Sequence, residues 1–410
     1  MNNIVHKLSP MLTGAELQQA LAVQPAYNPD IRNASTAERL IALNDIYDVY
    51  FPFSMSAEIY SKLYLALIRS MQKKTGRLAV MQRNLNSRIA RGQSYTGIVG
   101  GSDSFTIIGR SGIGKSTAIS RAIDLIGGNR LIEMEQPFSK IIPILVVQTP
   151  WDCSVKNLLL AILRTIDDIL ATHYYQDASK YRATTDTLIG LVSNACLNHV
   201  GVLVADEIQN CANSKNGTVL IGSLTQLINN SGISICMVGT PESAPFFEQD
   251  YKLARRSLGL NYSEMPLNQD FVDFVTLLYR YQYVSGTMEL TDTVIQWLYD
   301  HTGGILANLV TLLHDAQEVV ILDNATESVT LDLLNRVYKE RMGLLHSHIE
   351  LDQVRAGSAL KPKNKPMPKV SAPVNLEKGL FTKLAAEAKA KDTDIVSLLK
   401  MHIPVIEVAV

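Results

Sequence analysis

Two kinds of segment alternate along the middle of this chain. Continuous apolar runs of strand length occur at 105–108, 141–148, 201–205 and 233–238, and such runs suit strands that are covered on both faces. Between them, apolar residues recur at helical spacing from 115 to 126, from 154 to 173 and from 181 to 199. Buried strands that alternate with helices predict a parallel sheet and an α/β fold.

Helical spacing also dominates both flanks of this region. Helices are predicted at 37–50 and 57–73 before it, and near 270–283, 291–301, 305–322 and 331–345 after it. The stretch 353–373 is rich in lysine and proline and predicts an extended linker. A last helix at about 376–401 and an apolar end follow, for which partner binding and packing against the body are both open.

The first chemical motif lies at 104–121, SFTIIGRSGIGKSTAISR. It fits the P-loop pattern G-x-x-x-x-G-K-[ST] at Gly109, Gly114, Lys115 and Ser116, in the required order of strand, turn and helix. The glycines allow consecutive backbone N–H groups to surround phosphate oxygens, and the helix N-terminus favours the same anion. We expect nucleotide contacts from Gly109, Arg110, Ser111, Gly112, Ile113, Gly114, Lys115, Ser116 and Thr117.

The second motif is the apolar run GVLVADE at 201–207, which has the form of a Walker B strand. Two adjacent carboxylates at the end of a buried strand are costly unless a metal or donors are present. Asp206 is therefore expected to bind Mg²⁺ together with Ser116, while Glu207 polarises the attacking water. Thr240, after the next apolar strand, is expected to orient this water or to contact the γ-phosphate.

Composition narrows the class of protein further. The 410 residues have an ordinary globular balance, 47% hydrophobic and 19% charged, and a formal charge of −1 excludes a globally basic nucleic-acid binder. Four cysteines without C-x-x-C spacing predict reduced thiols. The sequence has no apolar run of membrane-spanning length and does not begin like a signal peptide, so we expect a cytoplasmic protein that makes no membrane contact.

Charge is strongly biased in one region. Between 59 and 102 the chain has eight basic residues and no acidic one: Lys62, Arg69, Lys73, Lys74, Arg77, Arg83, Arg88 and Arg91. These residues form either a solvated helical face or a surface for nucleic acid or an acidic protein.

The strings GRSGIGKST, GVLVADEIQN and ICMVGTPES, followed by LARRS, resemble the AAA+ ATPases of the TnsC and TniB type, which regulate DNA transposition. The resemblance covers roughly 94–345. It implies a parallel sheet of order 5-1-4-3-2, an α-helical lid, and ATP with Mg²⁺ at a subunit interface. The implied domains are a helical N-terminal extension (1–95), an AAA+ nucleotide-binding domain (96–266), a lid (267–346), and a linker with a partner-binding segment (347–410).

The resemblance also implies roles for residues outside the two motifs. Arg255 and Arg256 stand where such ATPases present an arginine finger to a neighbouring subunit, and Lys156 stands where family members contact DNA. The lid departs from the family pattern G-x-x-R, because the corresponding stretch at 303–308 is GGILAN and contains no arginine. Asn308 can hydrogen-bond to a nucleotide but cannot neutralise its charge, so slow hydrolysis is expected.

These observations favour an AAA+ ATPase that assembles on double-stranded DNA as a ring or helical filament. The resemblance implies that it links a target-selection protein of the TniQ or TnsD type to the transposase. Two alternatives stay open at this point: a loader of a replicative helicase, and a signalling ATPase that acts through protein partners.

Overall fold

The computed structural model describes residues 7–74, 77–89, 91, 104–127, 130–135, 138–180, 183–211, 217–244, 247, 259–286, 288–323 and 328–344. The chain divides into two compact units, Met1–Gln353 and Val354–Val410. The second unit lies outside the described residues, and so do the predicted last helix and the whole predicted linker. The bounds of the four domains given above stay predictions.

In the described part of the chain, six strands form one sheet in the order β2-β3-β4-β5-β1-β6. The strands are β1 (Phe105–Gly109), β2 (Ile132–Glu135), β3 (Phe138–Gln148), β4 (Val200–Asp206), β5 (Ser234–Gly239) and β6 (Leu260–Tyr262). All neighbours are parallel except the edge pair β2 and β3. The observed sheet has one strand more than expected, the edge strand β2. If the other five strands are numbered 1 to 5 along the chain and read from β6 to β3, their order is the expected 5-1-4-3-2.

The parallel register brings the chemical motifs to one edge of the sheet. Asp206 pairs with Gln148 at the ends of β4 and β3, and Gly239 pairs with Ile108 near the ends of β5 and β1. Carboxyl ends of parallel strands meet at the same edge, where ligands of α/β proteins bind. The sheet therefore brings the P-loop, the Walker B carboxylates and Thr240 together.

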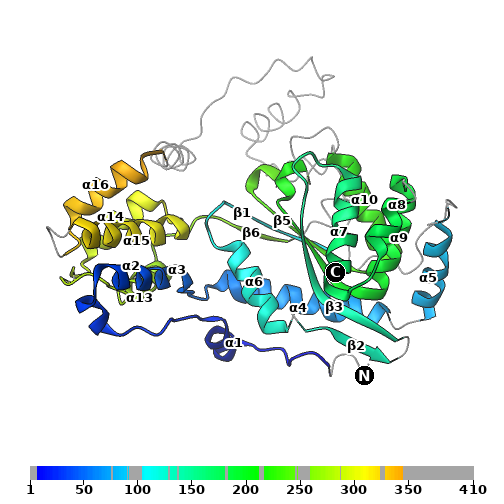
Figure 1. The fold of residues 1–410 in the computed structure, drawn as a ribbon, viewed down its shortest axis with the longest axis horizontal. Coiled ribbons are helices and arrows are strands. Elements are labelled where there is room, and N and C mark those ends of the chain that lie inside the picture. The colour runs from blue at the N-terminus through cyan, green and yellow to red at the C-terminus, as the bar shows by residue number, and fades with distance from the viewer. Residues whose placement is uncertain are drawn as a thin grey trace, which may run out of the picture. The chain divides into compact units, whose positions relative to one another are not determined.

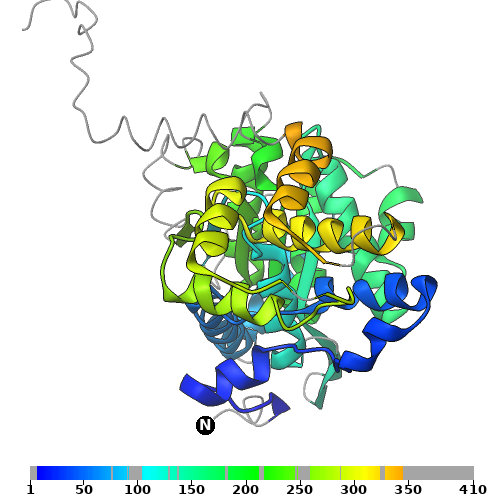
Figure 2. The same cartoon turned by 90° about the vertical axis from the view of Figure 1, so that its left-hand side faces the viewer.

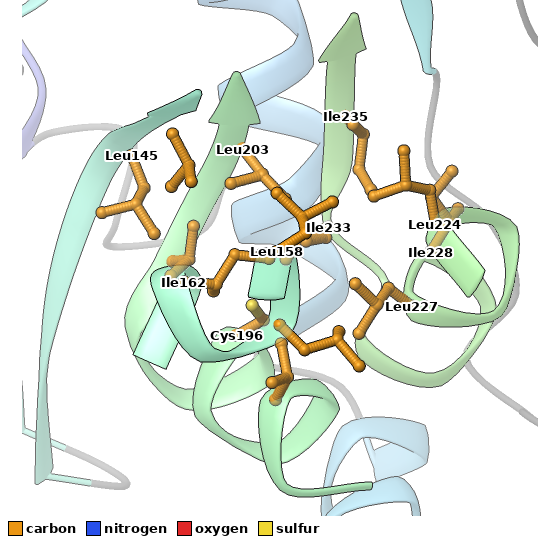
Figure 3. Close-up of a cluster of buried hydrophobic side chains, with 14 of the residues drawn as sticks. Leu145, Leu158, Ile162, Cys196, Leu203, Leu224, Leu227, Ile228, Ile233 and Ile235 are labelled. Carbon is orange, nitrogen blue, oxygen red and sulfur yellow. The ribbon is translucent and has the colours of Figure 1, made fainter. Parts of the chain in front are cut away.

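One face of the sheet is covered by helices α7 (Val155–Leu170), α9 (Thr185–His199) and α10 (Gly217–Ser231). Figure 3 shows this apolar core, in which Leu158, Cys196 and Leu224 of these helices gather beside Leu203 and Ile235 of the strands. All five side chains are at least 98% buried.

The opposite face is covered by α4 (Ser54–Lys74) and α6 (Lys115–Ile126), with α1 (Gly14–Leu21) packed beside them. Val202 and Val204 point to this face, whereas Leu203 between them belongs to the other core. This alternation explains why β4 is apolar at every position before Asp206. The sheet thus lies between two helical layers, as Figure 1 shows.

The lid contains α13 (Gln269–Leu278), α14 (Asp292–Thr302), α15 (Leu306–Asp323) and α16 (Leu331–Arg341), close to the predicted positions. Figure 2 shows these helices together, coloured from yellow-green to orange. Leu43 of α2 (Thr36–Leu43) and Ile46 of α3 (Asp45–Asp48) are buried in the lid core. The N-terminal segment therefore contacts both the sheet, through α4, and the lid, through α2 and α3.

Several predicted helices have different bounds. The helix predicted at 37–50 is broken at Asn44, and the one at 154–173 ends at Leu170 because Ala171 has a φ of 55°. The helix predicted from 181 begins at Thr185, where the Thr184 hydroxyl accepts a hydrogen bond from the N–H of Thr187 at 3.3 Å. Among the described residues, the helices α5 (Arg77–Ile89), α8 (Tyr174–Lys180) and α10 were not predicted.

The basic stretch at 59–102 is not one uniform surface. Lys74 is buried, and its ammonium group donates to the carbonyl oxygens of Cys196 at 2.6 Å and Leu197 at 2.9 Å. Arg83 donates to Asn198 Oδ1 at 2.7 Å. Through these hydrogen bonds, Lys74 and Arg83 stabilise the C-terminal end of α9. Lys74 is thus unavailable to a partner.

The cysteines and the helices bear on two further expectations. Cys196 and Cys236 are free and buried, but Cys153 is disulfide-bonded, so the prediction of reduced thiols is wrong at Cys153.

No single helix in the described ranges is long and apolar enough to cross a membrane, although the bent pair α14 and α15 meets the same criterion together.

Candidate nucleotide-binding site

The loop between β1 and α6 presents backbone groups to the edge of the sheet. Gly112 and Gly114 have φ values of 82° and 93°, in the left-handed region that glycine adopts without strain. Gly114 is also the N-cap residue of α6, and it has no side chain with which to cap the helix. The N–H groups of the first turn are therefore available to an anion such as phosphate.

Lys115 begins α6, and its side chain folds back over this loop. Its ammonium group donates to the carbonyl oxygens of Gly109 at 2.6 Å and Arg110 at 2.7 Å. Burial lowers the pKa of Lys115, and nearby carboxylates, led by that of Asp206, oppose the shift. A bound phosphate would stabilise this buried cation directly.

The two carboxylates of the Walker B segment occupy different environments. The Asp206 side chain accepts a hydrogen bond from the backbone N–H of Glu207 at 2.8 Å, and the Asp206 carbonyl oxygen accepts one from Thr149 at 2.8 Å. Glu207 is exposed and has a φ of 58°, which is strained for a residue with a side chain. Such strain persists where neighbouring contacts fix the backbone, and it is common at active sites.

A short 3-10 helix, η3 (Ile208–Cys211), follows Glu207 and fixes its surroundings. The Gln209 side-chain amide donates to the Glu207 carboxylate and accepts from the N–H of Thr240 at 3.3 Å. The Asn210 side chain donates to the carbonyl oxygen of Thr149 at 3.0 Å. Sequence reasoning missed Gln209 and Asn210, although both stand in the string DEIQN that carried the resemblance.

Thr240 lies at the end of β5, as expected, and faces the same cavity as Glu207. Its side chain hydrogen-bonds to Glu242, and this bond is the main reason why the pKa of Glu242 lies below its usual value. The structure therefore brings Lys115, Asp206, Glu207 and Thr240 to one site.

A cavity of about 390 Å³ opens at this site, which is within the usual size range for ligand pockets. Its lining includes polar and P-loop residues: Ser111, Gly112, Gly114, Lys115, Ser116, Thr117, Asp206, Glu207, Gln209 and Thr240. It also includes apolar and aromatic residues: Tyr47, Val49, Tyr50, Phe51, Phe53, Phe274, Leu306, Ala307 and Val310. The polar residues suit phosphates, and the aromatic side chains suit a planar base.

The aromatic residues that line the cavity were not predicted as site residues. Most come from the segment between α3 and α4 in the N-terminal region, far from the P-loop in sequence. The one signal in the sequence is Phe51-Pro52-Phe53, which predicts a break between two helices and carries no chemistry of its own.

The polar residues of the cavity offer oxygen ligands that suit Mg²⁺. The Ser116 hydroxyl and the Asp206 carboxylate line the same cavity. Among the described residues, no three His, Cys, Asp or Glu side chains are grouped so as to hold a metal. Mg²⁺ commonly binds through one or two protein oxygens together with phosphates and water, so the residues present fit a nucleotide-bound Mg²⁺.

The lid contacts the P-loop through its backbone. The N–H of Ala307 donates to the carbonyl oxygen of Gly112 at 3.0 Å. Asn308 is not among the residues that line the cavity, and its amide donates to the carbonyl oxygen of Thr302 at 3.5 Å. Leu306, Ala307 and Val310 thus line the cavity, whereas Asn308 does not.

The remaining predicted site residues lie away from the cavity or outside the described part. Arg110 forms an ion pair with Glu264. Lys156 is exposed on the first turn of α7. Arg255 and Arg256 lie outside the described residues, so their predicted role as an arginine finger stays a prediction.

The sheet, the P-loop, the Walker B strand and the helical lid define the class of this protein: it is an AAA+ ATPase. Residues 101–261 match the family described as "Bacterial TniB protein". This match includes both nucleotide motifs and confirms the resemblance to ATPases of the TnsC and TniB type. No curated protein matches the chain.

Solved structures resemble the chain only distantly. The Orc1 protein of Aeropyrum pernix in complex with DNA has 14% identity and a TM-score of 0.42, and the match covers 81% of this chain and 80% of that protein. The ADP form of the ORC2 protein of the same organism has 15% identity and a TM-score of 0.42, with 71% and 74% coverage. A mutant RuvB of Thermotoga maritima has 13% identity and a TM-score of 0.36, with 79% and 84% coverage. The fold assignment therefore stands on the topology and the site.

Proposed function

We propose that this AAA+ ATPase assembles in an ATP-dependent way on double-stranded DNA and couples target-site selection to the transposase during DNA transposition. The observation that carries the proposal is the TniB family match over residues 101–261. This range contains the P-loop, the Walker B strand and the strand end with Thr240, so it covers the nucleotide site that would control assembly.

The nucleotide site supports hydrolysis with divided roles. Lys115 and the N-terminal N–H groups of α6 would bind the β- and γ-phosphates, and Glu207 would accept a proton from the attacking water. Ser116 and Asp206 would hold Mg²⁺, which neutralises phosphate charge when it is bound. Thr240 lies at the same cavity and would orient the water.

Assembly would complete the site in a neighbouring subunit. An arginine that reaches the γ-phosphate of the adjacent subunit stabilises transition-state charge, and Arg255 and Arg256 are the candidates. Without an arginine in the lid stretch at 303–308, each subunit has one fewer positive charge for the nucleotide. We therefore propose that hydrolysis is slow and that its rate sets the lifetime of the assembled state.

DNA binding would depend on phosphate contacts and would ignore base sequence. Lys156 is exposed on the first turn of α7, where the helix N-terminus also favours phosphate. Lys62, Arg77 and Arg91 are exposed in the basic stretch and form the second candidate surface. The protein partners would be a second copy of the chain, the transposase, and a target-selection protein of the TniQ or TnsD type.

Sedimentation and ATP turnover, each measured with and without duplex DNA, test this proposal. The proposal predicts large assemblies only when ATP and duplex DNA are both present. Assemblies that form with ATP alone would support a signalling ATPase that acts through protein partners. Recruitment of a replicative helicase, without assembly on duplex DNA, would support a helicase loader.

A further inference from the structure

The Gln209 side chain contacts both Glu207 of the Walker B segment and Thr240 after the neighbouring strand. Its amide contacts the Glu207 carboxylate, and it also accepts a hydrogen bond from the N–H of Thr240 at 3.3 Å. Glu207 follows β4 and Thr240 follows the neighbouring strand β5. One amide therefore bridges the expected base and the residue expected to contact the γ-phosphate.

The chemistry of the two partners fixes the orientation of this amide. A backbone N–H can only donate, so Thr240 must face the amide oxygen Oε1. An ionised carboxylate can only accept, so Glu207 must face the amide nitrogen Nε2. A glutamate at position 209 could accept the hydrogen bond from Thr240 but would repel the Glu207 carboxylate. A methionine has no N–H donor for Glu207 and only a weak sulfur acceptor for Thr240.

The surrounding backbone leaves room for this bridge and holds it in place. A Cβ atom added at Gly239 would lie 3.0 Å from Gln209 Oε1 and 2.7 Å from Ile208 Cγ2. On the other side of η3, Asn210 donates through its side chain to Thr149 at 3.0 Å and through its N–H to Glu207 at 3.1 Å. The turn that presents Gln209 is thus bound at the ends of both strands that flank β4.

We propose that Gln209 is a positioning residue for ATP hydrolysis, which holds the Glu207 carboxylate at the cavity and couples its position to Thr240. The inference rests on the proposed role of Glu207 as the base. Glu207 has a backbone φ of 58°, so contacts around its side chain and backbone must maintain its position. A contact at the γ-phosphate that moves Thr240 would move the amide and, through it, the carboxylate.

The direct test is the variant Gln209→Met, which keeps the side-chain length and removes both hydrogen bonds. Misplacement of the base should lower kcat about tenfold to a hundredfold, while KM and the Kd for ATP stay within about threefold of the wild type. The matched control is Gln296→Met, since the Gln296 amide also donates to a carboxylate, that of Asp300, at 2.9 Å on the lid helix α14. The control should leave kcat unchanged.

A double-mutant cycle separates positioning from a general structural effect. In the Glu207→Gln background the carboxylate is already absent, so Gln209→Met should cause no further loss of single-turnover rate. A full additional loss in that background would overturn the inference, and so would wild-type kcat in Gln209→Met. If Gln209→Met fails to fold, Gln209→Glu serves the same cycle, with at least the same loss expected from charge repulsion.

The outcomes also distinguish this inference from the proposed function. Loss of hydrolysis in Glu207→Gln with normal hydrolysis in Gln209→Met would contradict only the positioning role. Wild-type hydrolysis in Glu207→Gln would remove Glu207 from the role of base, and the proposed division of roles would fail with it.

Discussion

The backbone N–H of Ala307 in the lid donates to the carbonyl oxygen of Gly112 in the P-loop, at a distance of 3.0 Å. The side chains of Ile305 and Ala307 also lie close to Gly112. A Cβ atom added at Gly112 would lie 2.8 Å from Ile305 Cγ2 and 3.2 Å from Ala307 Cβ. The lid and the phosphate loop are therefore in direct contact, and a change in one displaces the other.

This contact predicts the effect of Gly112→Ala. The added methyl group would press against the lid, and alanine would be strained at a φ of 82°. We expect the Kd for ATP to rise about fivefold or more, by analogy with the cost of about 1–3 kcal/mol for such strain. Isothermal titration calorimetry with ATP measures it directly.

The matched control is Gly222→Ala in α10, where an added Cβ would meet no atom within 4 Å. That change should leave ATP affinity unchanged and raise stability by about 0.5–1 kcal/mol, because alanine favours the helix interior. Equal ATP affinity in the two variants would contradict the importance of the contact between lid and P-loop.

Lys74 predicts a pH dependence of stability. Burial lowers the pKa of Lys74 to about 7, whereas an unfolded lysine has a pKa of about 10.4. Between these values the unfolded chain binds a proton that the folded chain does not, so Lys74 makes stability rise with pH, by up to about 1.4 kcal/mol per pH unit. Denaturant unfolding between about pH 7 and 10 measures this slope.

In Lys74→Met this contribution disappears, and the slope of stability against pH should fall. The control Lys339→Met removes a lysine that is exposed on α16 and should keep the wild-type slope. An unchanged slope in Lys74→Met would mean that the buried ammonium group keeps its proton through its bonds to the carbonyl oxygens of Cys196 and Leu197.

Lys156 predicts how DNA affinity responds to salt. If phosphate contacts dominate, affinity falls by about 0.9 decades per decade of salt for each contact, with little dependence on sequence. Lys156→Ala should therefore reduce the slope by about 0.9, and Lys339→Ala, far from α7 in the chain, should leave it unchanged. Titrations at several salt concentrations provide the slopes, and an unchanged slope in Lys156→Ala would favour the basic stretch at 59–102.

The C-terminal unit predicts a separation of functions. The lid helices end by Arg341, and the cavity is lined by residues up to Thr311. Deletion of residues 354–410 should therefore leave ATP hydrolysis and DNA-dependent assembly nearly intact, while binding of the transposase drops sharply. A truncated protein that no longer assembled would show that this segment belongs to the oligomer interface.

Local patterns in the sequence predicted much of the site. The P-loop and the Walker B strand each combine an apolar run with chemistry at its end, and the parallel register brings those ends together. Lys115, Asp206 and Thr240 accordingly line one cavity. The lid helices were predicted nearly as well, because their apolar residues recur at helical spacing.

Contacts between distant segments were not predictable in the same way. Tyr47 and Phe51 line the cavity only because α2 and α3 pack on the lid, and no local pattern indicates that packing. The helix α5 buries Gln82 and Asn86, which hydrogen-bond to each other at 2.8 Å, and exposes Leu78 and Met81. Its burial pattern therefore departs from that of an ordinary amphipathic helix.

The most direct test of the account is a single-turnover measurement of ATP bound to the wild type, to Lys115→Ala and to Glu207→Gln. Lys115→Ala should fail to bind ATP, because the phosphates lose the buried ammonium group. Glu207→Gln should bind ATP with near wild-type affinity and hydrolyse it only at a small residual rate, because the amide cannot accept a proton from water. Hydrolysis by Glu207→Gln at the wild-type rate would contradict the assignment of this site.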